Sequence, residues 1–385
     1  MRTRKNLLLL FLVSALITLG ACRKQTASPN ANSTSQPSTE APFGGKANAG
    51  DKYFFRGTIA NNLSIEMSLV REGERLTGTY FYPRVGKNIN VSGTVDKDGN
   101  VDLKESDEGG KDTGVFKGKW NAATDSPDSS LNEITGKWSK PDGSKETEFQ
   151  VSQQPIAFTA AVRVVPKVIK EANKEKRYTV DAEYPQIEGD ARFDGFNREA
   201  RGLVTKDMAA FKTGESSTEG DAGSELPPET QQSSLNMGYE IRFATDELIS
   251  VEFTEATYEA GAAHGNSATE VLNYDVRNNK KLALADLFNP KTTYLSVISS
   301  YCISNLRDRS KREADSMIDE DMMKTGAAPQ ASNYQACAIT KKGLWVTFDP
   351  YQVAAYAAGP QHVLVPYSAL KDILKTDGPL APLAR

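Results

Sequence analysis

Histidine and cysteine, which most often bind zinc or transfer protons near neutral pH, are scarce in this sequence. The 385 residues include only two histidines, His264 and His362, and three cysteines. A catalytic zinc site usually takes three protein ligands, often closely spaced histidines, and these two are far apart. The motifs C-x-x-C, G-x-x-x-x-G-K-[ST] and G-x-S-x-G are absent. We therefore expect no metal, no cofactor, no catalytic residue and no enzyme activity, although a glycosidase-type carboxylate pair would leave no sequence signature.

The strongest binding signal lies in the stretch from Tyr258 to Phe288. His264 stands there among small residues, in the run GAAHGN, which lets a ligand or another backbone come close. A histidine in this setting could contact a ligand and titrate near neutral pH. It could instead lock a tight turn by bonding to a carbonyl or carboxylate. We name Tyr258, His264 and Asn266 as candidate binding residues.

A second candidate segment is Pro350–Gly359, which is rich in tyrosine and small residues. Tyr351 and Tyr356 could form the rim of a partner-binding surface, because tyrosine is favoured at interfaces. The alternative interpretation is a packed loop that closes a sheet. Both tyrosines therefore join the candidate binding residues.

Cys302 and Cys337 remain as a pair once the third cysteine, Cys22, is assigned to lipid attachment. An even pair in an oxidising compartment favours a disulfide. Cys302 also falls on the apolar face of an expected helix, where a buried free thiol would be at home. We predict the disulfide and keep two buried thiols as the alternative.

The first 22 residues have the features of an export signal. A basic start (Arg2, Arg4, Lys5) precedes an apolar run, which is shorter than the ~20 residues that a spanning helix needs. The segment Leu19–Cys22 resembles the lipobox of bacterial lipoproteins, which implies an acyl chain such as palmitate on Cys22. We expect a lipid-anchored protein in the cell envelope, facing outside the cytoplasm. Because Arg23 follows the cysteine, we expect the outer membrane in a cell that has two.

Composition bounds the rest of the chain. Removing residues 1–21 takes away three basic residues and no acidic one, so the formal charge changes from −4 to −7. This balance argues against general nucleic-acid binding, which needs basic patches. Residues 23–50 are rich in Ser, Thr, Asn, Pro, Ala and Gly, and we expect a disordered tether there.

Residues 51–152 predict a β-barrel-like domain, because alternation of apolar and polar residues and turn signals repeat closely. Eight strands are expected: Tyr53–Ala60, Leu63–Val70, Arg75–Tyr82, Asn88–Val95, Asn100–Glu105, Thr113–Trp120, Leu131–Ser139 and Lys145–Val151. Short links predict an antiparallel meander, and repeated Gly-x-aromatic motifs indicate bends in a curled sheet. A barrel of ~8 strands either fills with side chains or holds a small ligand. We favour a filled barrel because the aromatic residues are numerous.

Residues 153–385 predict an α+β domain, an antiparallel sheet with packed helices. Expected strands and helices alternate along it: strands Phe158–Ile169 and Arg177–Tyr184, a helix around Phe193–Phe211, strands Leu235–Ala244 and Leu248–Tyr258, a helix Thr293–Arg312, strands Tyr334–Thr340, Leu344–Phe348 and Val363–Pro366, and a helix Tyr367–Leu374. Asp190 is the candidate N-cap of the first helix.

Seven short segments of this domain resemble one family in the same order. They are Tyr184–Ile187, Gly261–Gly265, Leu272–Asp275, Leu284–Phe288, Gly343–Phe348, Pro350–Gly359 and Val365–Leu370. Together they resemble the extracytoplasmic domain of the RsiV anti-sigma factors, and a similar domain is joined to the catalytic domain of some peptidoglycan deacetylases. The resemblance covers roughly residues 155–375. It implies an envelope protein with a binding role, since the RsiV domain binds lysozyme.

We therefore expect a non-catalytic, lipid-anchored envelope protein that binds a lysozyme-like protein or a peptidoglycan glycan. The alternative is a carrier that holds a small apolar ligand in the N-terminal barrel. Neither reading fixes the oligomeric state.

Overall fold

The computed structural model describes residues 50–122, 131–214, 231–313 and 316–383. The expected signal with Cys22, and the expected tether up to residue 49, lie outside these ranges, as does most of the polar segment before Leu235. Within the described ranges, no helix has both the length and the apolar character to cross a bilayer.

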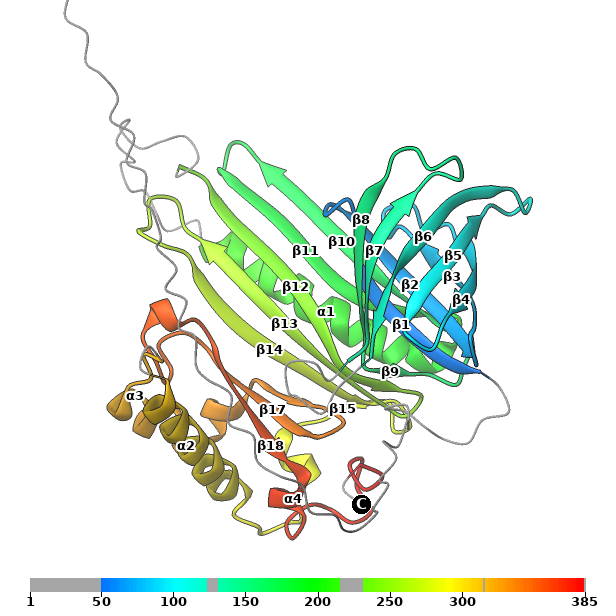
Figure 1. Ribbon diagram of the computed structural model, residues 1–385. Helices are drawn as coiled ribbons and strands as arrows, with labels where there is room; N and C mark the ends of the chain where they lie inside the picture. Colours follow the sequence, from blue (N-terminus) through cyan, green and yellow to red (C-terminus); the bar gives the residue numbers. More distant parts are fainter. Residues whose placement is uncertain (1–49, 123–130, 215–230, 314–315, 384–385) are drawn as a thin grey trace, which may run out of the picture. The chain divides into compact units, whose positions relative to one another are not determined.

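The N-terminal strands form a closed antiparallel barrel in sequence order (Figure 1), which confirms the predicted eight-stranded meander. The strands are β1 (Asp51–Ile59), β2 (Leu63–Glu72), β3 (Arg75–Phe81), β4 (Ile89–Val95), β5 (Asn100–Ser106), β6 (Asp112–Asn121), β7 (Glu133–Ser139) and β8 (Thr147–Gln153). The barrel closes where β1 pairs with β8, with Phe55 opposite Gln153. Gly118 and Gly136 face each other on β6 and β7, and a Cβ on Gly136 would lie 2.4 Å from the Gly118 Cα. Side chains at these positions would therefore separate the strands.

Side chains fill the barrel interior. The Phe116 ring makes edge contacts with Tyr80, at 5.5 Å between centroids, and with Phe149, at 5.0 Å. All three rings are at most 4% exposed. The interior therefore matches the filled barrel that the aromatic content predicts.

One carboxylate lies within this apolar interior. Glu105 is 5% exposed and accepts hydrogen bonds from the Tyr80 hydroxyl (2.8 Å), the Trp138 Nε1 (2.8 Å) and the Thr113 hydroxyl (2.6 Å). Burial and the neighbouring carboxylate raise the pKa of Tyr80. Because a buried charge is tolerated only when it is hydrogen-bonded, these three donors make Glu105 compatible with the core.

Glu105→Ala should destabilise the barrel, because it leaves three donors without an acceptor. Each unsatisfied buried group costs about 1–3 kcal/mol, so we expect a loss of about 3 kcal/mol or more in unfolding free energy. Urea unfolding followed by tryptophan fluorescence measures it, since Trp120 and Trp138 lie in the barrel. Glu108→Ala, at a side chain 73% exposed, is the control. Equal midpoints for the two variants would contradict the assigned role.

The larger sheet of the C-terminal part has seven strands in the order β10-β11-β12-β13-β14-β15, with β9 paired to β12. Their bounds are β9 (Ile156–Ala157), β10 (Arg163–Asn173), β11 (Tyr178–Glu188), β12 (Ser233–Thr245), β13 (Leu248–Tyr258), β14 (Asn266–Asp275) and β15 (Lys280–Lys281). The predicted strands pair as antiparallel hairpins, β10 with β11 and β12 with β13. The sheet is mixed rather than purely antiparallel, because β12 runs parallel to both β11 and β9. A parallel pair needs a crossover connection, and helix α1 (Asp194–Gly214) lies in the one between β11 and β12.

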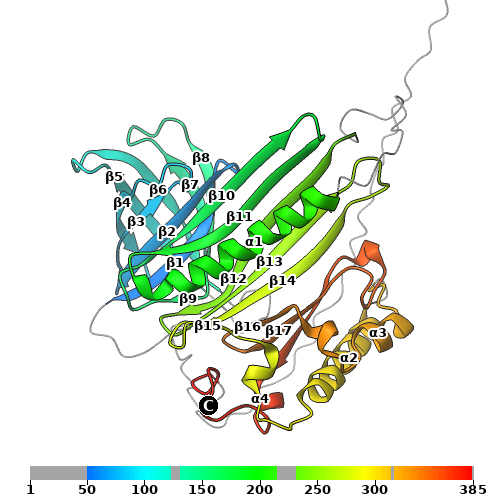
Figure 2. The ribbon, with the colours of Figure 1, turned by 180° about the vertical axis from the view of Figure 1, so that it is seen from behind.

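Helix α1 lies along the face of this sheet that is turned to the viewer in Figure 2. Its apolar stripe includes Phe196, Ala200 and Val204, which are 0% exposed and pack in one core with Val251 and Leu272. Burial of such a stripe drives the helix onto the sheet.

A three-stranded antiparallel sheet forms a second layer with its own core. It comprises β16 (Cys337–Ile339), β17 (Gly343–Phe348) and β18 (Gln361–Pro366). Helices α2 (Tyr294–Arg312), α3 (Glu320–Gly326) and α4 (Tyr367–Leu370) accompany it. Ile298 and Leu306 of α2 pack with Val346 and Val363 in this core. Helix α3 lies between the expected helix Thr293–Arg312 and the expected strand Tyr334–Thr340, where no helix is predicted from the sequence.

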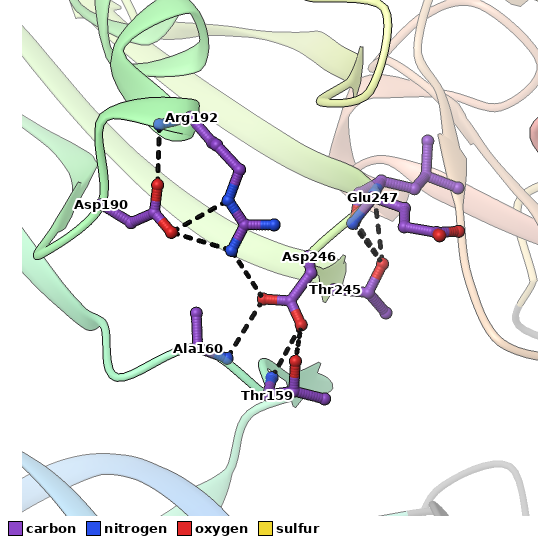
Figure 3. A network of polar contacts seen from close by, with 8 residues as sticks. Thr159, Ala160, Asp190, Arg192, Thr245, Asp246 and Glu247 are labelled. Atoms are coloured by element: carbon purple, nitrogen blue, oxygen red, sulfur yellow. Dashed lines mark hydrogen bonds and ion pairs between the residues drawn. The ribbon is translucent and has the colours of Figure 1, made fainter.

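A polar network fixes the turn between β12 and β13 (Figure 3). The Asp246 carboxylate accepts hydrogen bonds from the Thr159 hydroxyl and backbone N–H (2.9 Å) and from the Ala160 N–H (3.3 Å). Arg192 lies 4.0 Å from it and also binds Asp190. Asp190 caps the short 3-10 helix that leads into α1, as predicted for an N-cap.

Asp246→Asn should weaken folding at neutral pH and much less in acid. Burial alone would raise the pKa of Asp246, but the hydrogen bonds from Thr159 and Ala160 and the Arg192 charge lower it below 3.8. This stabilisation is present above the unfolded-state pKa and is lost as the pH falls below it. We expect the unfolding free energy, measured by urea unfolding at pH 7, to be about 1 kcal/mol lower in the variant. This difference from the wild type should become smaller in acid. The exposed Glu247→Gln in the same turn is the control, and a loss independent of pH would contradict this assignment.

Candidate functional site

Two loops distant in sequence meet and carry three of the predicted binding residues. One is the turn between β13 and β14, and the other joins β17 to β18. The His264 ring stacks on Tyr356, with centroids 4.3 Å apart and planes at 29°. Tyr351 lies beside Tyr356, at 5.4 Å and 32°. We call His264, Tyr351 and Tyr356 the aromatic cluster.

One carbonyl joins the two loops. The Gly265 carbonyl accepts a hydrogen bond from the Tyr356 hydroxyl (2.6 Å) and lies 2.7 Å from the His264 Nδ1. A carbonyl can only accept, so in this contact Nδ1 carries the proton. His264 therefore locks its turn, while its side chain remains exposed. Both interpretations of this histidine, turn lock and contact residue, are compatible with the geometry.

Tyr351 combines exposure with an unfavourable backbone. Its φ angle is 70°, in the left-handed region, and it is 57% exposed. A bulky residue rarely adopts this conformation, and such strain concentrates at ligand-binding and switch positions. Burial of the Tyr351 ring therefore does not account for its presence.

The other two candidates, Tyr258 and Asn266, lie at the same hairpin. The Tyr258 hydroxyl donates to the Ala262 carbonyl at 3.2 Å and so braces the turn. Asn266 is the first residue of β14, directly after Gly265, and is exposed. Asn266 is thus an exposed polar residue adjacent in sequence to Gly265, the acceptor of the Tyr356 hydroxyl, whereas Tyr258 makes a local structural contact.

The loop that carries the two tyrosines is anchored on both sides. On one side, the Asp349 carboxylate accepts a hydrogen bond from the Thr269 N–H of β14 (3.2 Å). On the other side, the Gln352 amide donates to the Gly326 carbonyl (2.9 Å) and to the Asn333 carbonyl (3.1 Å). These contacts anchor the loop that carries the two tyrosines.

A chain of polar groups that is buried at its centre, and that was not predicted from the sequence, lies at the base of this loop. Arg242 donates to Glu252 at 2.7 Å, and the Thr347 hydroxyl donates to the same carboxylate at 3.1 Å. The Thr347 oxygen also lies 3.1 Å from the His362 Nδ1. Glu252 and Thr347 are 4% and 2% exposed. We call these four residues the buried polar chain. The available signal was Glu252, an acid within the apolar strand LISVEF.

Burial shifts the pKa values of two titratable groups in this region. Burial lowers the pKa of His362, with Arg242 and Arg309 acting in the same direction. Burial also raises the pKa of Asp349, whose Oδ1 is buried without a hydrogen-bond partner among the described residues. The His362 ring stacks on Trp345, with centroids 5.1 Å apart.

The Thr347 hydroxyl beside His362 is buried, so a substrate cannot reach it as the structure stands. Among the described residues, no group of three His, Cys, Asp or Glu side chains is arranged to hold a metal ion.

The two cysteines are buried free thiols rather than the predicted disulfide. Both lie in the core between α2 and the three-stranded sheet. Burial raises the pKa of both thiols, to about 12 for Cys337. In such a core a free cysteine packs as a small apolar residue, which is the alternative that the helix position of Cys302 suggested.

Thiol titration checks this assignment. In the chain from residue 23 on, the native protein should react very slowly with Ellman's reagent, because buried thiols with a raised pKa form little reactive thiolate. After denaturation in guanidinium without reductant, two thiols should react. Zero reactive thiols after denaturation would show a disulfide and contradict the structure.

Part of the C-terminal region is similar in sequence to part of a peptidoglycan deacetylase. A family profile described as "Deacetylase PdaC" matches residues 171–267, and one described as "Protein of unknown function (DUF3298)" matches residues 285–368. The peptidoglycan-N-acetylmuramic acid deacetylase PdaC of Bacillus subtilis is 33% identical over 146 residues. These are 38% of this chain and 30% of that protein, so the chain matches under a third of the relative's length.

Two solved structures of DUF3298 proteins also resemble the chain. That from Bacteroides fragilis NCTC 9343 covers 59% of this chain and 98% of its own, at 17% identity and a TM-score of 0.43. That from Pseudomonas aeruginosa PAO1 covers 56% and 94%, at 19% identity and a TM-score of 0.39. The predicted relation to a domain of peptidoglycan deacetylases is thus supported by the matched profiles, while the relation to RsiV stays a prediction.

Proposed function

We propose that this protein is a non-catalytic binding protein of the cell envelope that holds a peptidoglycan glycan at the aromatic cluster. The observation that carries the proposal is Tyr351, an exposed ring kept on a left-handed backbone beside Tyr356 and His264. Glycine adopts a left-handed backbone without steric penalty, so a loop alone would not require tyrosine at this position. Tyrosine there is explained by contact with a ligand.

The positions of the matched segments support the same site. His264 lies in the segment similar to the deacetylase PdaC, and both tyrosines lie in the DUF3298 segment. The cluster is therefore assembled from the two segments together. The relative's name states that it acts on N-acetylmuramic acid in peptidoglycan, which supports a glycan of that class as the ligand.

The chemistry of the cluster suits a sugar. One face of a pyranose ring presents apolar C–H groups that can pack on an aromatic face, while its hydroxyl groups need nearby polar partners. The aromatic rings offer the first and exposed Asn266 offers the second. Tyrosine is also common at protein interfaces, so a lysozyme-like protein is the second ligand to test.

The expected lipid on Cys22 and the tether complete the proposal. A lipid at Cys22 would hold the protein on a membrane, and residues 23–50 would give the folded part reach toward the wall. The alternative carrier function gains no support from the barrel, because closely packed rings occupy its centre.

Tyr351→Gly tests the proposal by separating binding from stability. Glycine relieves the left-handed strain at the cost of a more flexible unfolded chain, so the unfolding free energy should be unchanged or raised by up to about 1 kcal/mol. Retention by insoluble peptidoglycan of the chain from residue 23 on should fall at least tenfold. The same preparation should be tested against lysozyme.

Val85→Ala, at a barrel residue 70% exposed, is the control for loss of an exposed apolar side chain and should bind as the wild type does. If Tyr351→Gly binds peptidoglycan as strongly as the wild type does, the aromatic cluster is not the binding site. If the protein binds lysozyme but not peptidoglycan, the glycan is rejected as the ligand, while the aromatic cluster remains the proposed binding surface.

A further inference from the structure

We infer that the buried polar chain positions the loop carrying Tyr351 and Tyr356, and that protonation of His362 releases this loop from the His264 hairpin. The inference rests on the proposed function and adds its regulation: the site would be assembled near neutral pH and loosened in mild acid.

The first support is the position of the buried polar chain. Thr347 and His362 are directly paired on β17 and β18, so they form the base of the loop between these strands. Glu252 is on β13, whose far end leads into the turn with His264. The contact between Thr347 and Glu252 therefore ties the base of the tyrosine loop to the strand that carries the other half of the cluster.

The second support is the direction of the hydrogen bonds. Thr347 has a single hydroxyl proton, which it donates to the carboxylate of Glu252, because an ionised carboxylate can only accept. Its oxygen must then accept from His362, so neutral His362 carries its proton on Nδ1. An additional proton must go to Nε2, which makes the ring positive.

The third support is the set of charges around that ring. Arg242 from β12 and Arg309 from α2 face His362 and oppose a positive charge there. Glu252 from β13, Glu240 from β12 and Asp349 after β17 favour it. Arg309 also donates to the His362 carbonyl, at 3.3 Å. Burial and two guanidinium groups thus oppose protonation.

The direction of the pH effect follows from linkage. Since the docked state depresses the pKa of His362 below 6.5, the released state takes up the proton first, and docking weakens as the pH falls from 6.5 to the docked-state pKa. Asp349 acts in the opposite sense, because its raised pKa makes the docked state favour the protonated carboxyl. One proton changes the docking equilibrium by at most about tenfold per pH unit.

The two histidines give a readout that needs no ligand, because His264 lies in the β13–β14 hairpin and His362 lies at the base of the tyrosine loop. In the chain from residue 23 on, with histidine labelled with ¹³C, NMR should show two ring signals. The His264 signal carries the ring-current effect of the stacked Tyr356. As the pH is lowered from about 7.5, the His362 signal should show one change, and the His264 signal should show a second change at the same midpoint.

His362→Asn is the matched variant, because the asparagine amide can replace the donor at Nδ1 and does not titrate in this range. It should retain the ring-current shift of His264 at neutral pH and lose the second change. Asp349→Asn, which still accepts from Thr269, should leave the change at His362 in place. A His264 signal that ignores the His362 midpoint in the wild type, or a second change that persists in His362→Asn, would overturn the inference.

Peptidoglycan binding is then measured at pH 7.5 and 5.5. We expect wild-type binding to weaken about three- to tenfold, and binding by His362→Asn to weaken by less than half as much on a logarithmic scale. Equal weakening in both proteins would overturn the regulatory role. No binding at either pH, with the NMR coupling present, would overturn the proposed function and leave the coupling established.

Discussion

The contact of Glu252 with Thr347 and Arg242 is the constraint on which the candidate site depends. It is an ionised group in the layer between two sheets, and it is stable there because each carboxylate oxygen has a donor. Leaving such a buried charge unpaired is costly. The three-stranded sheet is therefore most stable where Thr347 of β17 lies against Glu252 of β13. That alignment brings the loop after β17 against the hairpin of β13 and β14, and with it Tyr356 against His264.

The same constraint explains how strain at Tyr351 persists. A left-handed tyrosine in a free loop would relax, but the Asp349 and Gln352 contacts fix the backbone on either side of it. The proposed binding surface is thus preformed, and its rigidity comes from residues beneath it rather than from the aromatic rings. Because Thr347 pairs with His362 at the base of the loop, the group that stabilises the site also makes it sensitive to protons.

The sequence predicted what depends on local pattern. Alternation and turn residues predicted the barrel strands, and the three- and four-residue spacing around Phe196 predicted α1. Small residues beside His264 and the tyrosines near Gly359 marked the two loops separately. Their meeting could not be predicted, because it depends on the alignment of β14 with a loop some 80 residues later. The parallel pairing of β11 with β12, the free thiol state of Cys302 and Cys337, and the contact of Glu252 with Thr347 are non-local in the same way.

The most direct test of the central claim is amide hydrogen exchange with and without soluble peptidoglycan fragments, on the chain from residue 23 on. If the two loops form one binding surface, peptides covering residues 258–266 and 349–361 should both gain protection when the fragments are added, while the barrel strands remain unchanged. Protection confined to the barrel, or to only one of the two loops, would contradict the account.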